Sequence, residues 1–162
     1  MDSFFYYARN LVCVCIDSVY ERHAGGRIQT LYSYEPLPFV DIGDLILGLD
    51  AFYDIINFPQ ASVKLRSFRQ KRTVLTNPWT EVSDMSEIKD IDLSQHRGQI
   101  ATFLVQVQYR QNATWQGNLL WVEKNEKRNF RSALELIKLM DETLNESQVP
   151  TAEVSSETNP AG

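Results

Sequence analysis

Two cysteines and two histidines are the side chains of this sequence that could bind a metal ion or act as nucleophiles. Cys13 and Cys15 are separated by one residue, and the histidines are His23 and His96. Cysteine ligands of zinc usually come as pairs separated by two residues, which is not the spacing found here. A cysteine nucleophile needs an adjacent base and a third group that orients it, and the sequence marks no such group. The sequence therefore predicts no metal site, no cofactor and no catalytic residue, and two reduced thiols typical of a cytosolic protein.

Two aspartates, Asp50 and Asp141, occupy equivalent places in two segments of similar pattern. Two carboxyl groups held close together can share one proton and act as a general acid and base. Each aspartate also lies near the end of a predicted helix, on the edge that faces solvent, where an acid needs no special role. We favour this second interpretation, and an enzyme is the third of the hypotheses for function.

The strongest binding signal is the segment 59–75, which carries five cations and no acid in a chain whose net charge is −5. Single-stranded nucleic acid is bound by cations and aromatic rings together, because cations neutralise phosphate while rings stack on bases. The candidate nucleic-acid-binding residues of this segment are Lys64, Arg66, Phe68, Arg69, Lys71 and Arg72. The alternative is a solvated edge strand over residues 63–66, where lysine and arginine discourage aggregation.

Cationic and aromatic residues nearer the C-terminus could extend the same binding surface. The candidates are Arg110, Trp115, Trp121, Arg128 and Arg131. Each tryptophan could equally belong to the core or anchor a protein interface, since large aromatic rings contribute strongly to both. The acidic remainder of the chain argues against a general affinity for nucleic acids.

The elements that would position these residues follow from a pattern that occurs twice, at a constant offset along the chain. The anchors of the first copy are matched in the second as Gly26 and Gly117, Phe39 and Phe130, and Asp50 and Asp141. Apolar positions between the anchors match as well, as in Leu45 and Leu136. Equal spacing over about forty residues indicates one structural unit present twice.

Each copy is predicted to begin with a β-hairpin. Apolar side chains alternate along residues 11–20, with Val12, Val14 and Ile16 on one face and Cys13, Cys15 and Asp17 on the other. In residues 102–111 the buried face is expected to hold Phe103, Val105, Val107 and Tyr109, and the outer face Leu104, Gln106, Gln108 and Arg110. Such alternation is typical of half-buried antiparallel strands. Gly26 and Gly117 are expected to end the turns, at positions of positive φ, before returning strands over residues 27–34 and 118–124.

An amphipathic helix is predicted to close each copy. Asp41 and Ser132 are the expected N-caps, and Asp44 and Glu135 follow three residues later, as in a capping box. The first helix is expected to end at residues 57–59, because a proline disfavours helical geometry in the residue before it.

The sequence thus predicts an α+β fold: an internally duplicated ββ(β)α unit, with an antiparallel sheet packed by two pseudo-equivalent helices. The expected segments are a first repeat (1–58), a basic strand and acidic linker (59–100), a second repeat (101–145) and a disordered tail (146–162). The 43% apolar content is that of a globular protein. We expect neither a membrane span nor a signal peptide, because no run of eighteen apolar residues occurs and no basic residue precedes the N-terminal aromatics.

The stretch FRSALELIKLMDETL (130–144) resembles the helix that closes a repeat of PUR proteins. PUR, PC4-like and Whirly proteins share β-sheet-then-helix units, and this resemblance implies binding of single-stranded DNA or RNA on the sheet. Residues 101–145 are also similar to small bacterial proteins with a YRQNATWQG-like hairpin and an FRSALEL-like helix, a resemblance that implies no activity. The chain differs from PUR repeats in its acidic net charge and in having fewer predicted strands in each unit.

We conclude from the sequence that the protein is a non-enzymatic cytosolic interaction module. Its partner is expected to be another protein, bound through a sheet face or edge, and a homodimer is one form this could take. The alternative hypothesis is a single-stranded DNA- or RNA-binding protein of the PUR or PC4-like type.

Overall fold

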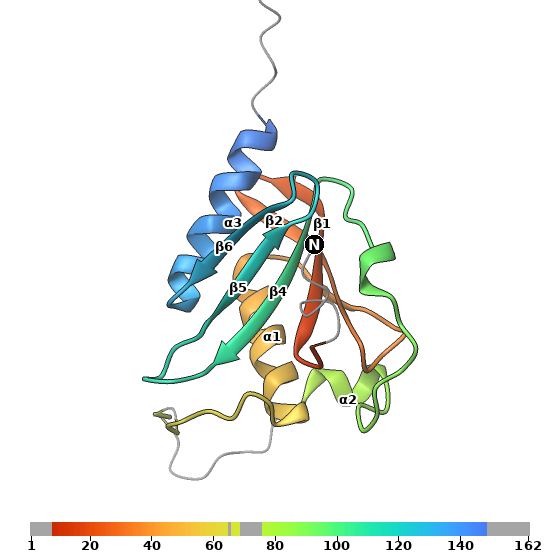
Figure 1. The fold of residues 1–162 in the computed structure, drawn as a ribbon, viewed down its shortest axis with the longest axis vertical. Helices are drawn as coiled ribbons and strands as arrows, with labels where there is room; N and C mark the ends of the chain where they lie inside the picture. The colour runs from red at the N-terminus through yellow and green to blue at the C-terminus, as the bar shows by residue number, and fades with distance from the viewer. Residues whose placement is uncertain (1–7, 65, 69–75, 149–162) are drawn as a thin grey trace, which may run out of the picture.

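The computed structural model describes residues 8–64, 66–68 and 76–148, and it has an α+β fold built on one antiparallel sheet (Figure 1). The α+β prediction is therefore confirmed. Across these described residues, none of the helices combines the length and the apolar character that crossing a bilayer requires.

Six strands and three α-helices make up the described chain. The strands are β1 (Leu11–Tyr20), β2 (His23–Thr30), β3 (Leu37–Phe39), β4 (Ala101–Tyr109), β5 (Gln116–Trp121) and β6 (Glu126–Phe130). The helices are α1 (Ile42–Ile56), α2 (Pro78–Val82) and α3 (Ala133–Gln148), with a 3₁₀ turn, η2, at Leu93–Gln95. Helix α3 thus continues beyond residue 145, where the tail was expected to begin.

The sheet has the strand order β3-β2-β1-β4-β5-β6, so each half of the chain contributes three adjacent strands. The two halves meet at the centre, where β1 and β4 run antiparallel over six residue pairs, from Leu11 opposite Gln106 to Ile16 opposite Ala101. Because this central pair is the only strand pairing between the halves among the named elements, it holds the sheet together as one unit.

Helices α1 and α3 cover the same face of the sheet, which we call the helix face (Figure 1). A side chain added at Gly48 of α1 would meet Ile28 of β2 and Leu37 of β3, which places α1 over the first half. The core between helix and sheet is rich in aromatic rings. Phe52 contacts Trp79 with ring centroids 5.7 Å apart, and Tyr53 contacts Trp115 at 5.9 Å. Burial of such rings contributes much of the hydrophobic stabilisation of a small sheet protein.

The opposite face of the sheet, which we call the open face, carries Cys13 and Cys15 of β1. Residues 83–100, the connecting segment, run from α2 to the start of β4 and make their contacts on this face (Figure 1). Burial on both sides explains why the central strands are apolar without alternation: residues 11–16 and 101–107 are all buried.

The turns predicted at Gly26 and Gly117 are wrong. Gly26 lies inside β2 and Gly117 inside β5, and neither has a positive φ. The first hairpin instead turns at Glu21 and Arg22, whose φ angles are 46° and 72°. Glycine is required for another reason: a Cβ atom on Gly26 would lie 1.8 Å from the carbonyl oxygen of Cys15. The strands approach too closely there for any side chain.

The predicted faces of Tyr109 and Arg110 are also wrong. A β-bulge between Val107 and Tyr109 shifts the pairing of β4 with β5, and a one-residue shift exchanges the two faces of a strand. Tyr109 is consequently 57% exposed, whereas Arg110 is only 6% exposed. The prediction that Leu104 and Gln106 lie on the outer face of β4 is also wrong. Both side chains are buried, because other parts of the chain cover that face.

The predicted helix caps are confirmed. The Asp41 carboxylate accepts a hydrogen bond from the Asp44 amide at 2.7 Å, and the Ser132 hydroxyl accepts one from the Glu135 amide at 3.0 Å. Helix α1 ends at Asn57, which adopts the left-handed conformation. The strand predicted over residues 63–66 is not formed at the described positions 63, 64 and 66; nearby, Ala61 makes a single isolated bridge to Arg110.

Candidate functional site

A cleft of about 990 Å³ lies between the connecting segment and the open face of the sheet. Six apolar residues line it: Leu31, Ile88, Ile91, Leu93, Leu120 and Val122. The polar lining residues are Lys89, Asp90, Asp92, Ser94, Gln95, Arg97 and Asn125. A cavity of this size lies at the upper end of the range for small-molecule sites and has room for several side chains of a bound peptide.

One end of the cleft is fixed by Lys89. Its backbone amide donates to the Leu31 carbonyl at 2.7 Å, and its ammonium donates to the carbonyls of Tyr32 at 2.6 Å and Asp84 at 2.9 Å. These hydrogen bonds join the connecting segment to the end of β2. The Lys89 side chain therefore acts as a tie between segment and sheet.

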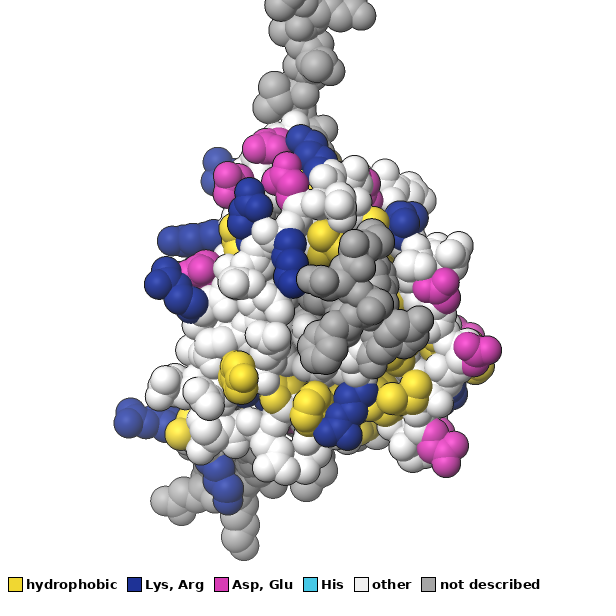
Figure 2. All heavy atoms as spheres, in the orientation of Figure 1, with side chains coloured by type: hydrophobic (Ala, Val, Ile, Leu, Met, Phe, Trp, Pro, Cys, Tyr) yellow, Lys and Arg dark blue, Asp and Glu magenta, His cyan; other side chains and the backbone are white. Residues whose placement is uncertain are grey.

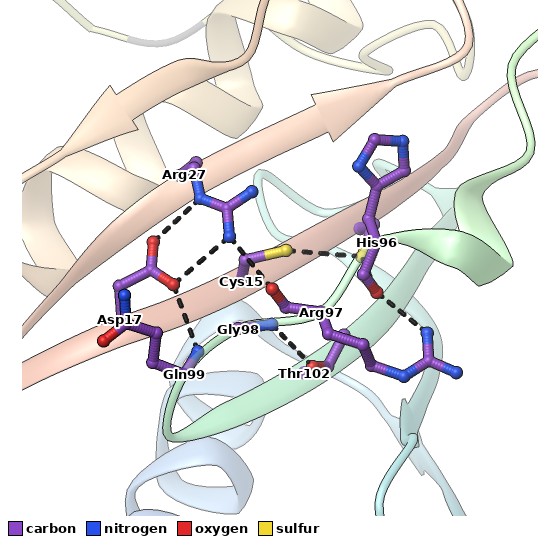
Figure 3. Close-up of polar contacts among 9 residues, drawn as sticks. Cys15, Asp17, Arg27, His96, Arg97, Gly98, Gln99 and Thr102 are labelled. Atoms are coloured by element: carbon purple, nitrogen blue, oxygen red, sulfur yellow. Dashed lines mark hydrogen bonds and ion pairs between the residues drawn. The ribbon is translucent and has the colours of Figure 1, made fainter.

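The other end of the cleft is fixed by an ion pair on β1 and β2 (Figure 3). The Arg27 guanidinium binds both carboxylate oxygens of Asp17, at 2.8 and 3.2 Å, and also donates to the Arg97 carbonyl at 2.9 Å. The same carboxylate accepts a hydrogen bond from the Gln99 amide at 3.1 Å. The Thr102 hydroxyl accepts another from the Gly98 amide at 2.9 Å. Residues 97–99 are thus held against the open face by side chains of three strands.

The two thiols lie next to this ion pair, under the connecting segment. Cys13 and Cys15 are free and buried, with their sulfur atoms 3.7 Å apart, and the Cys13 thiol also contacts the His96 carbonyl at 3.9 Å. The hydrogen bond from Cys13, together with the Arg27 charge, lowers the pKa of the Cys15 thiol. The same hydrogen bond, together with burial, raises the pKa of Cys13. The pair therefore consists of one acidified thiol and one thiol that retains its proton.

The histidine of this region is not placed as a base for the thiols. Burial and the Arg27 charge lower the pKa of His96, and its ring points away from Cys15 in Figure 3. Among the described residues, no group of three or more His, Cys, Asp or Glu side chains is arranged to hold a metal ion. The arrangement is thus a dithiol beside a cation rather than a ligand cluster.

Acidic side chains surround the connecting segment. Figure 2 shows them on the right of the view, on the side where this segment runs in Figure 1. The acids of the connecting segment are Asp84, Glu87, Asp90 and Asp92, and its cations are Lys89 and Arg97. The segment that borders the apolar lining of the cleft therefore carries a net charge of −2.

The candidate nucleic-acid-binding residues that the structure describes are divided between the surface and the interior. Lys64, Arg66 and Phe68 are exposed, whereas Arg69, Lys71 and Arg72 lie outside the described residues. Arg110 is buried: its guanidinium donates to Asp54 of α1 at 2.7 Å and to the Pro59 carbonyl at 2.7 Å. Its environment is that of a structural tie between β4 and α1.

The second-half candidates are divided between core and surface. Trp115 and Trp121 are 7% and 6% exposed, so neither ring presents a face on which a base could stack. Arg128 and Arg131 are exposed on or beside β6, where they pair with Glu126 and Glu135. Whether any of these residues binds nucleic acid stays a prediction.

The two equivalent aspartates have different partners. Asp50 lies 3.6 Å from the Arg110 guanidinium, whereas Asp141 accepts a hydrogen bond from Asn145. The two carboxylates therefore contact different residues, which agrees with the interpretation that each lies at the solvent-facing edge of its helix.

Sequence reasoning missed the cleft. The connecting segment has no apolar periodicity, so the sequence predicts only an acidic linker there. Its isolated apolar residues, Ile88, Ile91 and Leu93, are the one signal that could have shown that this linker packs on the sheet.

We compared the chain with protein-family models, curated proteins and solved structures. None matched. The geometry described above is therefore the basis for a functional proposal.

Proposed function

We propose that the protein is a non-enzymatic, cytosolic protein-interaction module. The cleft binds an extended segment of a partner polypeptide that carries apolar side chains flanked by lysine or arginine. The observation that carries this proposal is the apolar lining of a cleft of about 990 Å³ together with the net charge of −2 on the connecting segment that borders it. Apolar contacts supply affinity in such a site, and complementary charge supplies orientation and the rate of encounter.

The sheet edges are less suitable as contact surfaces than the cleft. Edge strand β3 contains Pro38, which has no amide proton to donate to an added strand. Edge strand β6 carries exposed Lys127 and Arg128, and charges of this kind oppose edge-to-edge pairing. A sheet face, rather than an edge, is therefore the more favourable contact surface.

A labelled peptide of alternating leucine and lysine tests the proposal by fluorescence anisotropy. Peptides of alternating serine and lysine, and of leucine and glutamate, are the comparison probes. We expect the leucine–lysine peptide to bind most tightly, because only it matches both the lining and the border of the cleft. Equal binding of the serine–lysine peptide would show that net charge alone is responsible and would refute the proposal.

A matched pair of variants locates the binding. Ile88→Asp changes a side chain of the cleft that is 54% exposed, and Leu134→Asp changes one on α3 that is 60% exposed. Both positions are exposed enough for the fold to tolerate the change. We expect Ile88→Asp to weaken peptide binding about tenfold, from lost apolar burial, and Leu134→Asp to leave it unchanged. Equal effects of both variants would place the peptide elsewhere.

A second candidate function is binding of single-stranded nucleic acid near Phe68. This ring is fully exposed, and it follows two exposed cations, Lys64 and Arg66, along the chain. Oligothymidylate binding at low salt tests this candidate, with Lys64→Glu and Arg66→Glu combined as the variant and Lys138→Glu as the control. Two phosphate contacts would give a log–log salt slope of about −1.4. No binding to wild type at low salt would exclude this function.

We also infer that the chain is an internal duplication of a three-stranded unit followed by a helix. Strand pairing supports this inference, because the register is the same in both halves. The equivalent pairs are Ile16–Gly26 and Val107–Gly117, then Gly26–Phe39 and Gly117–Phe130. At the centre, Cys13 is opposite Leu104, its own counterpart in the second copy, as expected at a pseudo-twofold axis. Equal destabilisation by equivalent glycine substitutions would test the inference.

A further inference from the structure

The proposed function does not use the dithiol on β1. Cys13 and Cys15 project from the same face of one strand, with their sulfur atoms 3.7 Å apart. A disulfide bond requires about 2.0 Å between the sulfurs. The two sulfur atoms must therefore approach each other by about 1.7 Å, which requires β1 to bend locally.

The thiols are connected to the cleft through the connecting segment. Cys13 contacts the carbonyl of His96, and Arg97, the next residue, lines the cleft. Four side chains of the open face hold residues 96–99 in place: Cys13, Asp17, Arg27 and Thr102. A change at Cys13 therefore alters one of these four polar contacts, beside the point where Arg97 enters the cleft lining.

We propose that Cys13 and Cys15 form a reversible disulfide in the presence of hydrogen peroxide, and that this bond weakens ligand binding in the cleft. The second half of this inference rests on the proposed function of the cleft, whereas the first half stands on the thiol geometry alone. Once the disulfide forms, Cys13 carries no proton, so the 3.9 Å contact between its sulfur and the His96 carbonyl is no longer a hydrogen bond. The wall formed by residues 93–97 then loses a contact with the sheet.

The reaction balances with one peroxide. The Cys15 thiolate attacks one peroxide oxygen, the O–O bond breaks, and a sulfenic acid forms while hydroxide leaves and takes up a proton to become water. The Cys13 sulfur then attacks the Cys15 sulfur, and the S–O bond breaks. The leaving hydroxyl takes the Cys13 proton and departs as a second water. The two thiols lose two electrons, and the peroxide is reduced to two waters.

The residues around the thiols suit Cys15 as the thiol that attacks peroxide and Cys13 as the thiol that attacks the sulfenic acid. Arg27 lies beside Cys15 across the β1–β2 pair and favours its thiolate, which is the form that attacks peroxide. Cys13 keeps its proton and is in contact with the sulfur that it must attack. Both thiols are buried beneath residues 96–99, so peroxide reaches them when this short segment opens. A bond that bends a central strand is strained, and strained disulfides are readily reduced.

Mass spectrometry and peptide binding together test the inference. After peroxide treatment of the whole protein, we expect the mass to fall by about 2 Da and both thiols to resist alkylation. Dithiothreitol should restore both properties. The leucine–lysine peptide should bind about fivefold more weakly to the oxidised protein, the change expected for the loss of about one hydrogen bond. Cys13→Ser and Cys15→Ser should each abolish the mass change.

Each outcome separates the two proposals. If the mass rises by the mass of added oxygen instead of falling by about 2 Da, or does not change, the disulfide inference is overturned. Peptide binding to the reduced protein still tests the cleft in that case. If the disulfide forms and binding is unchanged, the coupling is overturned. If the reduced protein binds no peptide, the proposed function fails, and with it the coupling, while the mass change still tests the thiol pair. Because the mass and alkylation measurements use wild type, they hold even if a serine variant does not fold.

Discussion

The close approach of strands at Gly26 and Gly117 yields the sharpest quantitative prediction. A Cβ atom at Gly26 would lie 1.8 Å from the Cys15 carbonyl oxygen, and one at Gly117 would lie 1.9 Å from the Gln106 carbonyl oxygen. Real Cβ atoms do not approach other atoms within 3.0 Å, so the strands must separate by more than 1 Å. In each case the displaced atom belongs to the backbone of a central strand and cannot rotate away.

We therefore expect Gly26→Ala and Gly117→Ala each to lower the free energy of unfolding by about 3–5 kcal/mol, since overpacking at a backbone contact exceeds the usual cost of an added methyl group. For a chain of this size the loss corresponds to a fall in Tm of about 10 °C. It also corresponds to a fall of about 2 M in the urea midpoint.

Urea unfolding followed by tryptophan fluorescence measures this effect, because the three tryptophans are buried at 0–7% exposure. Gly43→Ala is the matched control. A Cβ atom at Gly43 of α1 meets nothing closer than 3.3 Å, and alanine is favoured over glycine in a helix by up to about 1 kcal/mol. This variant should be as stable as wild type or more so.

A wild-type urea midpoint for Gly26→Ala or Gly117→Ala would refute the close-approach argument. Large destabilisation by only one of the two would leave the contact argument intact at that site and would contradict the inferred equivalence of the halves.

Three further predictions concern single side chains. Arg110→Met should lower the free energy of unfolding by about 2–3 kcal/mol, because the buried guanidinium loses its hydrogen bonds to Asp54 and a carbonyl while the partly exposed carboxylate is rehydrated; urea unfolding measures this. Tyr53→Phe should change stability by less than about 1 kcal/mol or increase it, since the buried hydroxyl has no hydrogen bond of normal geometry within the described chain; a thermal melt that shows a large loss would contradict this. Burial and the Arg27 charge lower the pKa of His96 in the folded state, so the unfolded state binds more protons and stability should fall as the pH drops below about 6.5. His96→Gln should flatten that part of the pH–stability curve.

Local patterns in the sequence were sufficient for the two hairpins and the helix caps. Asp41 and Ser132 could be recognised because an N-cap acts on amides two or three residues away. The pattern of apolar residues also located β1 and β4, although the two faces of residues 11–16 and 101–107 do not differ in burial. These signals depend only on neighbours along the chain.

Other features depended on pairing partners that the sequence does not display. The bulge before Tyr109 exchanged the predicted faces of Tyr109 and Arg110, because it arises from the register with β5. The role of Gly26 depends on a carbonyl eleven residues away along the chain. The cleft could not be predicted for the same reason. The isolated apolar residues of the connecting segment line a cleft only because the segment packs on the sheet, and the sequence does not show that contact.

The path of the connecting segment has a consequence for binding stoichiometry. Its contacts at Lys89, Arg97 and Gln99 are with residues of β1 and β2 or the loop that follows β2. Among the described residues, no hydrogen bonds of this kind join the connecting segment to the corresponding positions of the second half, where Leu120 and Val122 form the far wall of the cleft. Because the connecting segment is fixed mainly to one of two similar halves of the sheet, we expect one binding site in each chain rather than two. Titration of the protein with a cleft ligand should therefore saturate at one ligand per chain.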